Sequence, residues 1–174
     1  MQLPSQTDRK DPTRRRLGGS GFPSPEGETA EAFAAEIELR RLPQDYAAAV
    51  DRRDVTGLLD LFLPDARLTV VRGREGAEEY RGHEELPSLI DRLAECEATL
   101  HEVVNHQLEL DGSEATGEVS CIAHHVTRHP GFDARDLVMY LRYCDSYRRD
   151  QERWRFACRR LVVDWTELRR VRLP

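Results

Sequence analysis

The stretch Thr99–Leu110, TLHEVVNHQLEL, decides the fold, because it is long, rich in alternating apolar residues and followed by Asp111-Gly112, a dipeptide typical of hairpin turns. It predicts a long β-strand. Three more strand-like segments follow it, each bounded by turn or loop signals: Glu114–Arg128, Leu137–Arg149 and Arg155–Trp165. Four consecutive strands joined by short connections predict an antiparallel sheet.

Helical periodicity precedes these strands. From Thr29 onward apolar residues recur at spacings of two to four, and Pro43 predicts a break or kink in this first helix. Asp54 is a candidate N-cap for a second helix, and a third is expected after Tyr80-Arg81-Gly82. A short strand is expected before Gly73–Glu79, which has the composition of a turn. Helices followed by long strands indicate an α+β domain, with a curved sheet and the helices on one face.

The chain of 174 residues is long enough for one ordinary domain. Residues 1–28 are rich in Pro and Gly and contain few large apolar side chains, so they cannot bury enough surface to offset the entropy of ordering. We expect a disordered N-terminal tail over 1–28 and a folded domain over 29–174.

Composition and charge exclude several classes of function. The net charge is −6, which disfavours binding to nucleic acid, since such binding depends on Lys and Arg. No apolar run is long enough to cross a membrane and no secretion signal is seen, so a cytoplasmic protein is expected. No C-x-x-C pair occurs, so the cysteines are expected to be reduced core residues: Cys96, Cys121, Cys144 and Cys158.

Period-two alternation places polar side chains on the faces that carry most apolar residues. It puts His101 and Asn105 on one face of the first long strand, and His125 on the corresponding face of the second. In the fourth strand, Arg159 and Trp165 share the apolar side. Buried polar groups are costly unless they are hydrogen-bonded. The pattern therefore predicts a polar-lined pocket between the sheet and the helices.

Several motifs resemble the nuclear transport factor 2-like superfamily. Its opening is similar to Tyr46–Asp54 (YAAAVDRRD), Leu61–Ala66 (LFLPDA) and Tyr80-Arg81-Gly82. The SnoaL-like, scytalone-dehydratase-like branch of this superfamily is similar also to His101–Ala115 and Tyr143–Trp165. The likeness runs from about residue 37 to residue 168. It implies a cone-shaped, curved antiparallel sheet wrapped around N-terminal helices, a cystatin-like barrel that is often dimeric or trimeric.

The resemblance also implies a chemistry. Dehydratase and dehydrochlorinase members pair an aspartate of the first helix with a histidine of a long strand, which match Asp51 and His101. The dehydrochlorinase has an arginine that matches Arg159, but a lysine where this chain has Tyr46, which argues against dehydrochlorination. The implied activity is that of a cofactor-independent lyase or isomerase. It would dehydrate, isomerise or cyclise a small apolar carbonyl or polyketide-like metabolite.

Each candidate residue has an expected role in such a reaction. His101 is the expected general base and Asp51 fixes its tautomer, as in catalytic triads. Arg159 would stabilise developing negative charge, and His125 would act as a second acid. Six residues are expected to bind substrate: Tyr46, Asn105, Cys121, Met139, Tyr143 and Leu161.

Other interpretations remain open at this stage. Asp51 and His101 also fit a structural pair that holds the helix to the sheet. Arg159 also fits an ion-pair partner of Asp51 or Asp145, and His125 also fits a core histidine. The chain also fits a non-catalytic ligand-binding or assembly domain, or a structural protein like a dioxygenase small subunit. We expect no metal, no cofactor and no nucleic-acid partner. A homodimer or homotrimer is expected from apolar residues on the outer sheet face: Val104, Ile122, Val126 and Val138.

Overall fold

The computed structural model describes residues 30–73 and 76–174, so the tail expected over 1–28 lies outside the described residues. In this described part of the chain, all four helices and two strands precede a run of four long strands, which confirms the predicted α+β class. The elements in chain order are α1 (Ala30–Asp51), α2 (Val55–Asp60), β1 (Phe62–Arg72), β2 (Ala77–Arg81), α3 (Gly82–Glu85), α4 (Pro87–Asp91), β3 (Ala98–Asp111), β4 (Glu114–His129), β5 (Phe132–Asp150) and β6 (Arg153–Val171).

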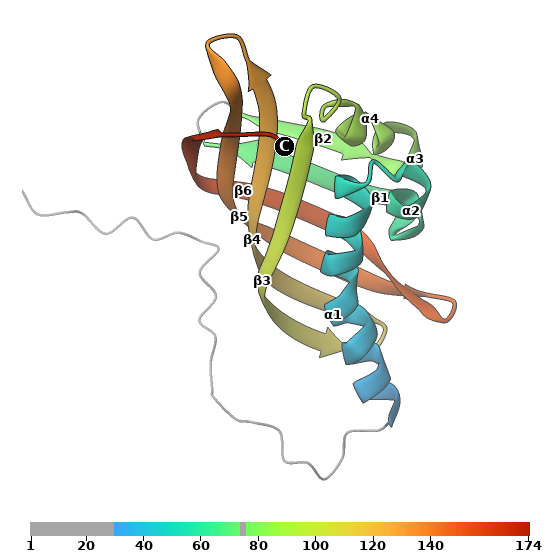
Figure 1. Ribbon diagram of the computed structural model, residues 1–174. Coiled ribbons are helices and arrows are strands. Elements are labelled where there is room, and N and C mark those ends of the chain that lie inside the picture. The colour runs from blue at the N-terminus through green and yellow to red at the C-terminus, as the bar shows by residue number, and fades with distance from the viewer. Residues whose placement is uncertain (1–29, 74–75) are drawn as a thin grey trace, which may run out of the picture.

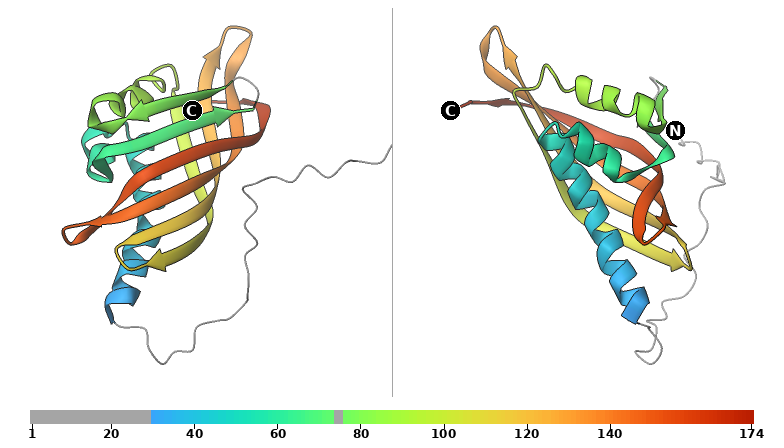
Figure 2. Two further views of the ribbon diagram at one scale, coloured as in Figure 1. Left: turned by 180° about the vertical axis from the view of Figure 1, so that it is seen from behind. Right: turned by 90° about the vertical axis from the view of Figure 1, so that its right-hand side faces the viewer.

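A single curved sheet forms the body of the molecule, with strand order β2-β1-β6-β5-β4-β3 (Figures 1 and 2). The four strands β3 to β6 are antiparallel neighbours, as the hairpin signals predict. β1 lies parallel to β6, a pairing between segments far apart in the chain that the hairpin signals did not indicate. β2 and β3 are the two edges, so the sheet does not close into a barrel within the described part of the chain.

Helix α1 covers one face of the sheet, and α2 to α4 gather near its C-terminal end (Figure 2). We call this covered side the inner face. The core forms where α1 residues such as Leu39, Leu42 and Tyr46 pack against inner-face residues of the strands, including Val119 and Tyr143. Burial of these large side chains is the main source of stability for such a layered arrangement.

The break expected at Pro43 is wrong, because α1 continues as one helix from Ala30 to Asp51. Proline removes one backbone donor and ordinarily disfavours a helix interior. Here Pro43 is fully buried, next to Leu42 and one turn from Leu39, both of which lie in the core. Packing against the sheet on both sides of Pro43 therefore holds the helix together.

Local signals were partly correct around the smaller elements. The Asp54 side chain caps α2 by accepting from the Gly57 backbone N–H at 2.8 Å, as predicted. The expected turn over Gly73–Glu79 instead leads into strand β2, and the expected third helix is two short helices. Gly82 begins α3 at φ 60°, where a Cβ would lie 2.7 Å from the Pro64 carbonyl oxygen, so this position requires glycine.

An irregularity in the β5–β6 pairing corrects the predicted position of Trp165. Tyr140 pairs with Trp165 while Leu141 pairs with Val163, so one extra residue lies in β6 between these pairs. Such a bulge reverses the alternation beyond it. Trp165 therefore stacks on Tyr140 with ring centroids 4.7 Å apart, on the outer face and 57% exposed, rather than beside Arg159.

Candidate active site

Asp51 and His101 lie in direct contact between α1 and the inner face of β3. The Nδ1–H group of His101 donates to Asp51 Oδ1 at 2.7 Å, and the His101 backbone N–H donates to Asp51 Oδ2 at 2.9 Å. Asp51 is the last residue of α1, so the helix end positions its carboxylate over the strand. Both carboxylate oxygens are thereby occupied by one residue, which fixes the imidazole relative to the helix.

The electrostatics of this pair favour an ionised carboxylate and a defined tautomer. Burial by itself would raise the pKa of Asp51, but the side-chain and backbone hydrogen bonds from His101 outweigh it, and the pKa is lowered. An ionised carboxylate only accepts, so the proton of a neutral His101 sits on Nδ1. The Nε2 atom makes no hydrogen bond within the described residues, and the His101 side chain is 7% exposed. It is available as a base.

His125 lies beside His101, with ring centroids 5.7 Å apart in an edge-to-face arrangement. Burial is the main cause that lowers the pKa of His125 to about 4, and the nearby charges of Arg53 and Arg72 act in the same direction. His125 is therefore neutral near pH 7. Its Nε2 atom is buried and has no partner in the described part of the chain. A buried nitrogen without a partner is costly to keep, which makes it a candidate contact for a ligand.

The expectation that Asn105 shares the face of His101 is wrong. Val103 pairs with Cys121 while Asn105 pairs with Ser120, so Val104 is an extra residue in β3. This bulge turns Asn105 to the outer, solvent-exposed side.

The same bulge turns His106 inward, a position that simple alternation did not predict. Its Nε2 atom lies 3.3 Å from the Tyr147 hydroxyl, which itself donates to Asp145 Oδ2 at 2.9 Å. Gly117 makes room for this contact, since a Cβ there would lie 2.7 Å from His106 Nε2. A histidine one residue beyond the expected pattern thus joins the polar groups of the inner face.

Arg159 is fully buried and paired with Asp145, one of the partners that the sequence left open. Its Nε and Nη2 atoms donate to Asp145 at 2.9 and 2.7 Å, and neither side chain is exposed. The guanidinium carbon also lies 4.0 to 4.2 Å from the ring centroids of Tyr46, Tyr143 and Phe156. The remaining nitrogen, Nη1, is buried and has no partner in the described part of the chain. One donor of Arg159 is therefore uncommitted.

The remaining expected substrate contacts lie on the inner side of the sheet or on α1. Tyr46, Cys121, Met139 and Tyr143 are buried, and Leu161 packs partly buried against them. Burial raises the pKa of Tyr46 to about 12, so its hydroxyl stays protonated. The Tyr143 hydroxyl donates to Cys121 Sγ at 3.6 Å. Burial also raises the pKa of the Cys121 thiol to about 11, which leaves it unreactive as a nucleophile.

At one end of the long strands, no helix of the described part of the chain covers the inner face. Leu137 pairs with both His125 and Leu168, and these two leucines are 36% and 61% exposed. Figure 1 shows the β4–β5 hairpin extending beyond helices α2 to α4 at this end. We call the surface of Leu137, Leu168 and His125 the open end of the inner face. These two exposed leucines lie in line with His125 across β4, β5 and β6.

Three charged residues at this end were not singled out from the sequence. Arg72 of β1, Glu78 of β2 and Arg92 just after α4 form an ion-pair cluster. The sequence gives a signal for Arg72, which lies at the same period-two position of β1 as buried Leu68 and Val70. A charged residue at the end of an apolar strand face ordinarily indicates the protein surface, so this signal alone was weak.

A second histidine–carboxylate pair, His124 and Asp136, lies on the outer face of the sheet. Nδ1 of His124 donates to Asp136 Oδ2 at 2.8 Å, and its Nε2 atom lies 3.6 Å from Glu102 Oε1. Both ring nitrogens of His124 thus face carboxylates. This pair is separated from the Asp51–His101 pair by the thickness of the sheet, and it offers a matched control for experiments on that pair.

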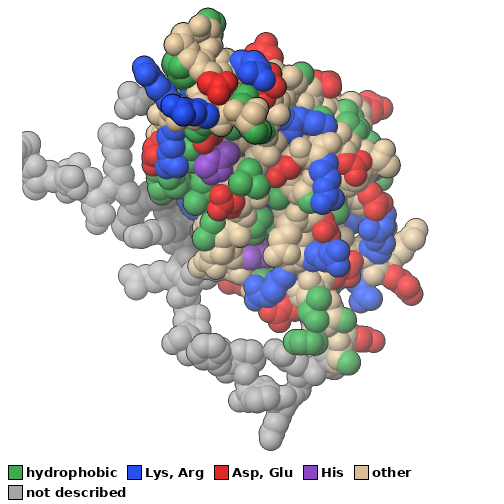
Figure 3. All heavy atoms as spheres, viewed as in Figure 1, with side chains coloured by type: hydrophobic (Ala, Val, Ile, Leu, Met, Phe, Trp, Pro, Cys, Tyr) green, Lys and Arg blue, Asp and Glu red, His purple; other side chains and the backbone are tan. Residues whose placement is uncertain are grey.

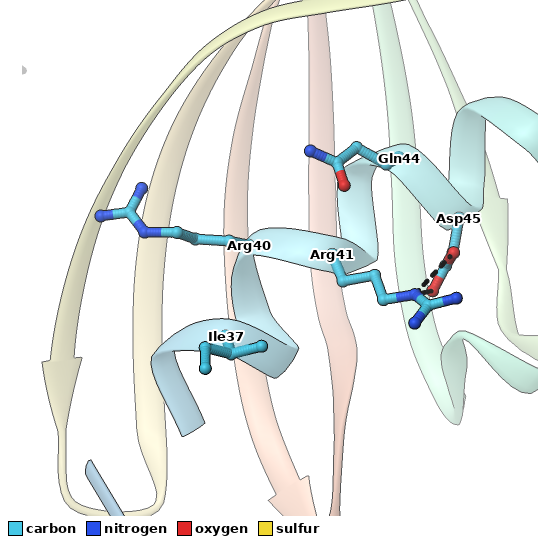
Figure 4. Close-up of a pocket in the computed structure, with 5 residues that line it drawn as sticks. All are labelled: Ile37, Arg40, Arg41, Gln44 and Asp45. Carbon is cyan, nitrogen blue, oxygen red and sulfur yellow. Dashed lines mark hydrogen bonds and ion pairs between the residues drawn. The ribbon is translucent and has the colours of Figure 1, made fainter. Parts of the chain in front are cut away.

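A shallow hollow on the solvent side of α1 lies apart from these histidines. It is lined by residues of one helix only: Ile37, Arg40, Arg41, Gln44 and Asp45. In Figure 4, Arg40 and Arg41 extend in different directions and Arg41 is joined to Asp45. The surrounding face carries charges of both signs, with apolar side chains grouped near the start of the helix (Figure 3). The Asp45 carboxylate in its lining is paired with Arg41.

Within residues 30–73 and 76–174, no three His, Cys, Asp or Glu side chains gather closely enough to hold a metal ion. No helix in that part of the chain combines the length and apolar character needed to cross a membrane.

Comparison with known proteins places this geometry in context. A family model described as "SnoaL-like domain" matches residues 31–160. No curated protein matches the chain. Among solved structures, a type 2 hexachlorocyclohexane dehydrochlorinase (LinA) has a TM-score of 0.72 at 18% identity, covering 83% of this chain and 95% of that one. A putative scytalone dehydratase from Novosphingobium aromaticivorans has a TM-score of 0.67 at 20% identity, covering 83% and 94%. A cystatin-like protein of unknown function from Nostoc punctiforme has a TM-score of 0.59 at 20% identity, covering 74% and 90%.

Proposed function

Because the chain belongs to the SnoaL-like domain family, we propose that it is a cofactor-independent lyase or isomerase acting on a small, largely apolar carbonyl compound. Dehydration, double-bond shift and ring closure all begin with removal of a proton beside a carbonyl group. The observation that carries the proposal is the Asp51–His101 pair, with Nδ1 held at 2.7 Å by a carboxylate and Nε2 without a hydrogen-bond partner among residues 30–73 and 76–174.

The proposed reaction begins with proton transfer to His101. Its Nε2 lone pair takes the proton from carbon, the C–H electrons form an enolate, and the charge of Asp51 stabilises the resulting imidazolium. The enolate then expels a leaving group with its electron pair, attacks a second carbonyl in the same molecule, or regains the proton at another carbon. These three outcomes correspond to dehydration, cyclisation and isomerisation.

Arg159 and His125 each have a buried nitrogen without a hydrogen-bond partner in the described part of the chain, and these nitrogens would contact the substrate. Nη1 of Arg159 would donate to the enolate oxygen, since Asp145 already holds the other two nitrogens. His125 is neutral near pH 7, so it would act as a hydrogen-bond partner of the substrate or leaving group rather than as an imidazolium acid. The walls around the substrate would be Tyr46, Cys121, Met139, Tyr143 and Leu161.

The test is exchange of α-protons in D₂O. The full chain is incubated with a panel of acetyl arenes and β-keto esters, and loss of the α-proton signal is followed by proton NMR. We expect His101→Gln to reduce exchange by about 100-fold or more, since general-base catalysis contributes about 10²- to 10⁴-fold. Asp51→Asn should reduce it less, because the base remains but its tautomer is no longer fixed.

The matched control is His124→Gln, which removes the same kind of histidine from the outer face. It should exchange α-protons at the wild-type rate. Exchange at the buffer rate with every compound would overturn the proposal, and so would His101→Gln retaining the wild-type rate. Melting temperatures of all variants separate loss of chemistry from loss of folding.

A non-catalytic assembly domain is a second candidate, favoured by the exposed apolar residues of the outer face. Leu100, Val104 and Trp165 are 51%, 63% and 57% exposed there. Large exposed apolar residues on one sheet face are typical of protein interfaces. A homodimer or homotrimer formed through this face, with no α-proton exchange by the assembled protein, would favour this candidate over the enzyme.

A further inference from the structure

A cluster of three charged side chains lies on the inner side of β1 and β2. Leu68 and Val70 of β1 are buried in the core, and Arg72 follows them at the same period-two position. On β2, Glu78 pairs with Val70, and it lies two residues from buried Tyr80 and so on the same face of the strand. The alternation of both strands therefore directs Arg72 and Glu78 to the inner side.

One carboxylate oxygen of this cluster accepts from three donors. Oε2 of Glu78 is 3.3 Å from Arg72 Nη1, 3.4 Å from the Tyr80 hydroxyl, and in contact with Arg92 Nη1. The hydrogen bond from Arg92, followed by the charges of both arginines, lowers the pKa of Glu78. Two guanidinium groups thus share one carboxylate, and the cluster keeps one unbalanced positive charge.

The cluster faces the end of the sheet where His125 lies. Arg92 is next to Leu93, whose carbonyl oxygen accepts from Arg53 Nη2 at 3.3 Å. Arg53 also donates to Thr99 Oγ1 at 2.6 Å, and Thr99 pairs with His125 in the β3–β4 ladder. Arg72 is close enough to His125 for its charge to contribute to the lowered pKa of that histidine.

We propose that Arg72 and Arg92 form a carboxylate-binding subsite beside the open end of the inner face, occupied by Glu78 when no ligand is bound. The inference rests on the proposed function and names its substrate class, an apolar carbonyl compound that also bears a carboxylate. Guanidinium groups bind carboxylates with defined planar geometry. The cluster carries one positive charge in excess, which a substrate carboxylate would neutralise, and the Glu78 side chain is 40% exposed, so water can solvate its carboxylate when the substrate takes its place. Side chains of Arg72 and Arg92 are 43% and 50% exposed, so a ligand can reach them.

The experiment compares two probes of the same shape and different charge, 4-acetylbenzoate and 4-acetylbenzamide. Binding to the full chain is measured by calorimetry at low ionic strength, where exposed charges are least screened. We expect the benzoate to bind the wild type more tightly than the benzamide. Arg72→Gln and Arg92→Gln should each weaken benzoate binding about three- to ten-fold and leave benzamide binding unchanged, as loss of a partly exposed ion pair predicts.

Glu78→Gln gives the most specific expectation. It removes the competing charge while keeping the shape of the side chain, so benzoate binding should strengthen about three- to ten-fold and benzamide binding should not change. Matched controls come from the other face of β2, where Arg81 and Glu79 form a similar pair. Arg81→Gln and Glu79→Gln should bind both probes like the wild type.

The outcomes separate this inference from the proposed function. Equal binding of the two probes to wild type and all variants overturns the subsite, and so does failure of the benzoate to bind the wild type at millimolar concentration. Exchange of the acetyl protons of the bound benzamide in D₂O, with no charge discrimination, leaves the proposed function standing without the subsite. Charge discrimination without α-proton exchange supports the subsite and counts against the enzyme.

Discussion

Replacing Arg159 by methionine should destabilise the protein severely, because it leaves a buried charge without a partner. Arg159 Nε and Nη2 donate to Asp145 at 2.9 and 2.7 Å, and both side chains are completely inaccessible to solvent. Removing one member of such a pair lowers the free energy of unfolding by about 3–5 kcal/mol, mostly because the other charge stays buried without a partner. The lost guanidinium contact with the rings of Tyr46, Tyr143 and Phe156 adds to this cost.

The same two strands supply a matched control on the outer face. Arg142 of β5 donates to Asp164 of β6 through two hydrogen bonds of 2.8 Å, so the chemistry of the pair is the same. These side chains are 41% and 28% exposed, and a solvated pair contributes only about 0–1 kcal/mol. Arg142→Met should therefore change the free energy of unfolding by less than about 1 kcal/mol.

The assay is urea denaturation at pH 7 followed by circular dichroism. A domain of this size has a stability of about 5–15 kcal/mol, so a loss of 3–5 is measurable. The double variant Arg159→Met/Asp145→Leu removes both charges and should recover most of the loss. If Arg159→Met alone does not fold, Asp145→Asn provides the milder single change, and it should still cost more than Arg142→Met. Equal effects of Arg159→Met and Arg142→Met, or no recovery in the double variant, would refute the reasoning.

Other polar groups of the inner face also affect the stability of the fold. The pKa of His125 is lowered from 6.5 to about 4, so the unfolded chain binds the extra proton first, and stability should fall by up to about 3 kcal/mol as the pH drops from 6.5 to 4. His125→Gln should flatten this part of the stability curve measured by thermal unfolding. The lowered pKa of Asp51 means that its charge stabilises the fold above about pH 4, so Asp51→Asn should cost about 1–2 kcal/mol at pH 7. That difference should shrink as the pH falls further and the wild-type carboxyl protonates; a constant difference would contradict the assignment. Gly117→Ala places a Cβ 2.7 Å from His106 Nε2 and 3.1 Å from the Tyr147 ring and hydroxyl, so it should cost about 1–3 kcal/mol in denaturant melts, and a neutral result would show that this contact adapts freely.

Local patterns in the sequence were sufficient for the first two helices, strand β1 and the four long strands, and for the residue types that meet at Asp51 and His101. Alternation failed wherever an extra residue entered a strand. The bulge at Val104 places Asn105 outside, and the bulge after Val163 does the same to Trp165. A bulge is set by pairing with the neighbouring strand, so a single strand gives little sign of it.

Long-range partners were also beyond the sequence signal. The sequence left Asp51 and Asp145 open as ion-pair partners of Arg159. Only the β5–β6 register, which pairs Arg159 with Asp145, decides between them. The Arg72–Glu78–Arg92 cluster depends on β2, a short strand that the glycine-rich segment before it concealed. Both arrangements arise from tertiary packing, which overrides local propensity.

Because of the bulge at Val104, the histidines that face inward depend on the number of residues in β3 as well as on their identity. Val103 and the residues before it face inward by one parity, and His106 and those after it by the other. A single-residue insertion or deletion in β3 would therefore exchange the whole set of inward side chains beyond that point, while β4, β5 and β6 keep their pairing. In evolution, one small insertion or deletion in this edge strand would change several site residues at once. The same change by substitution would need several separate mutations.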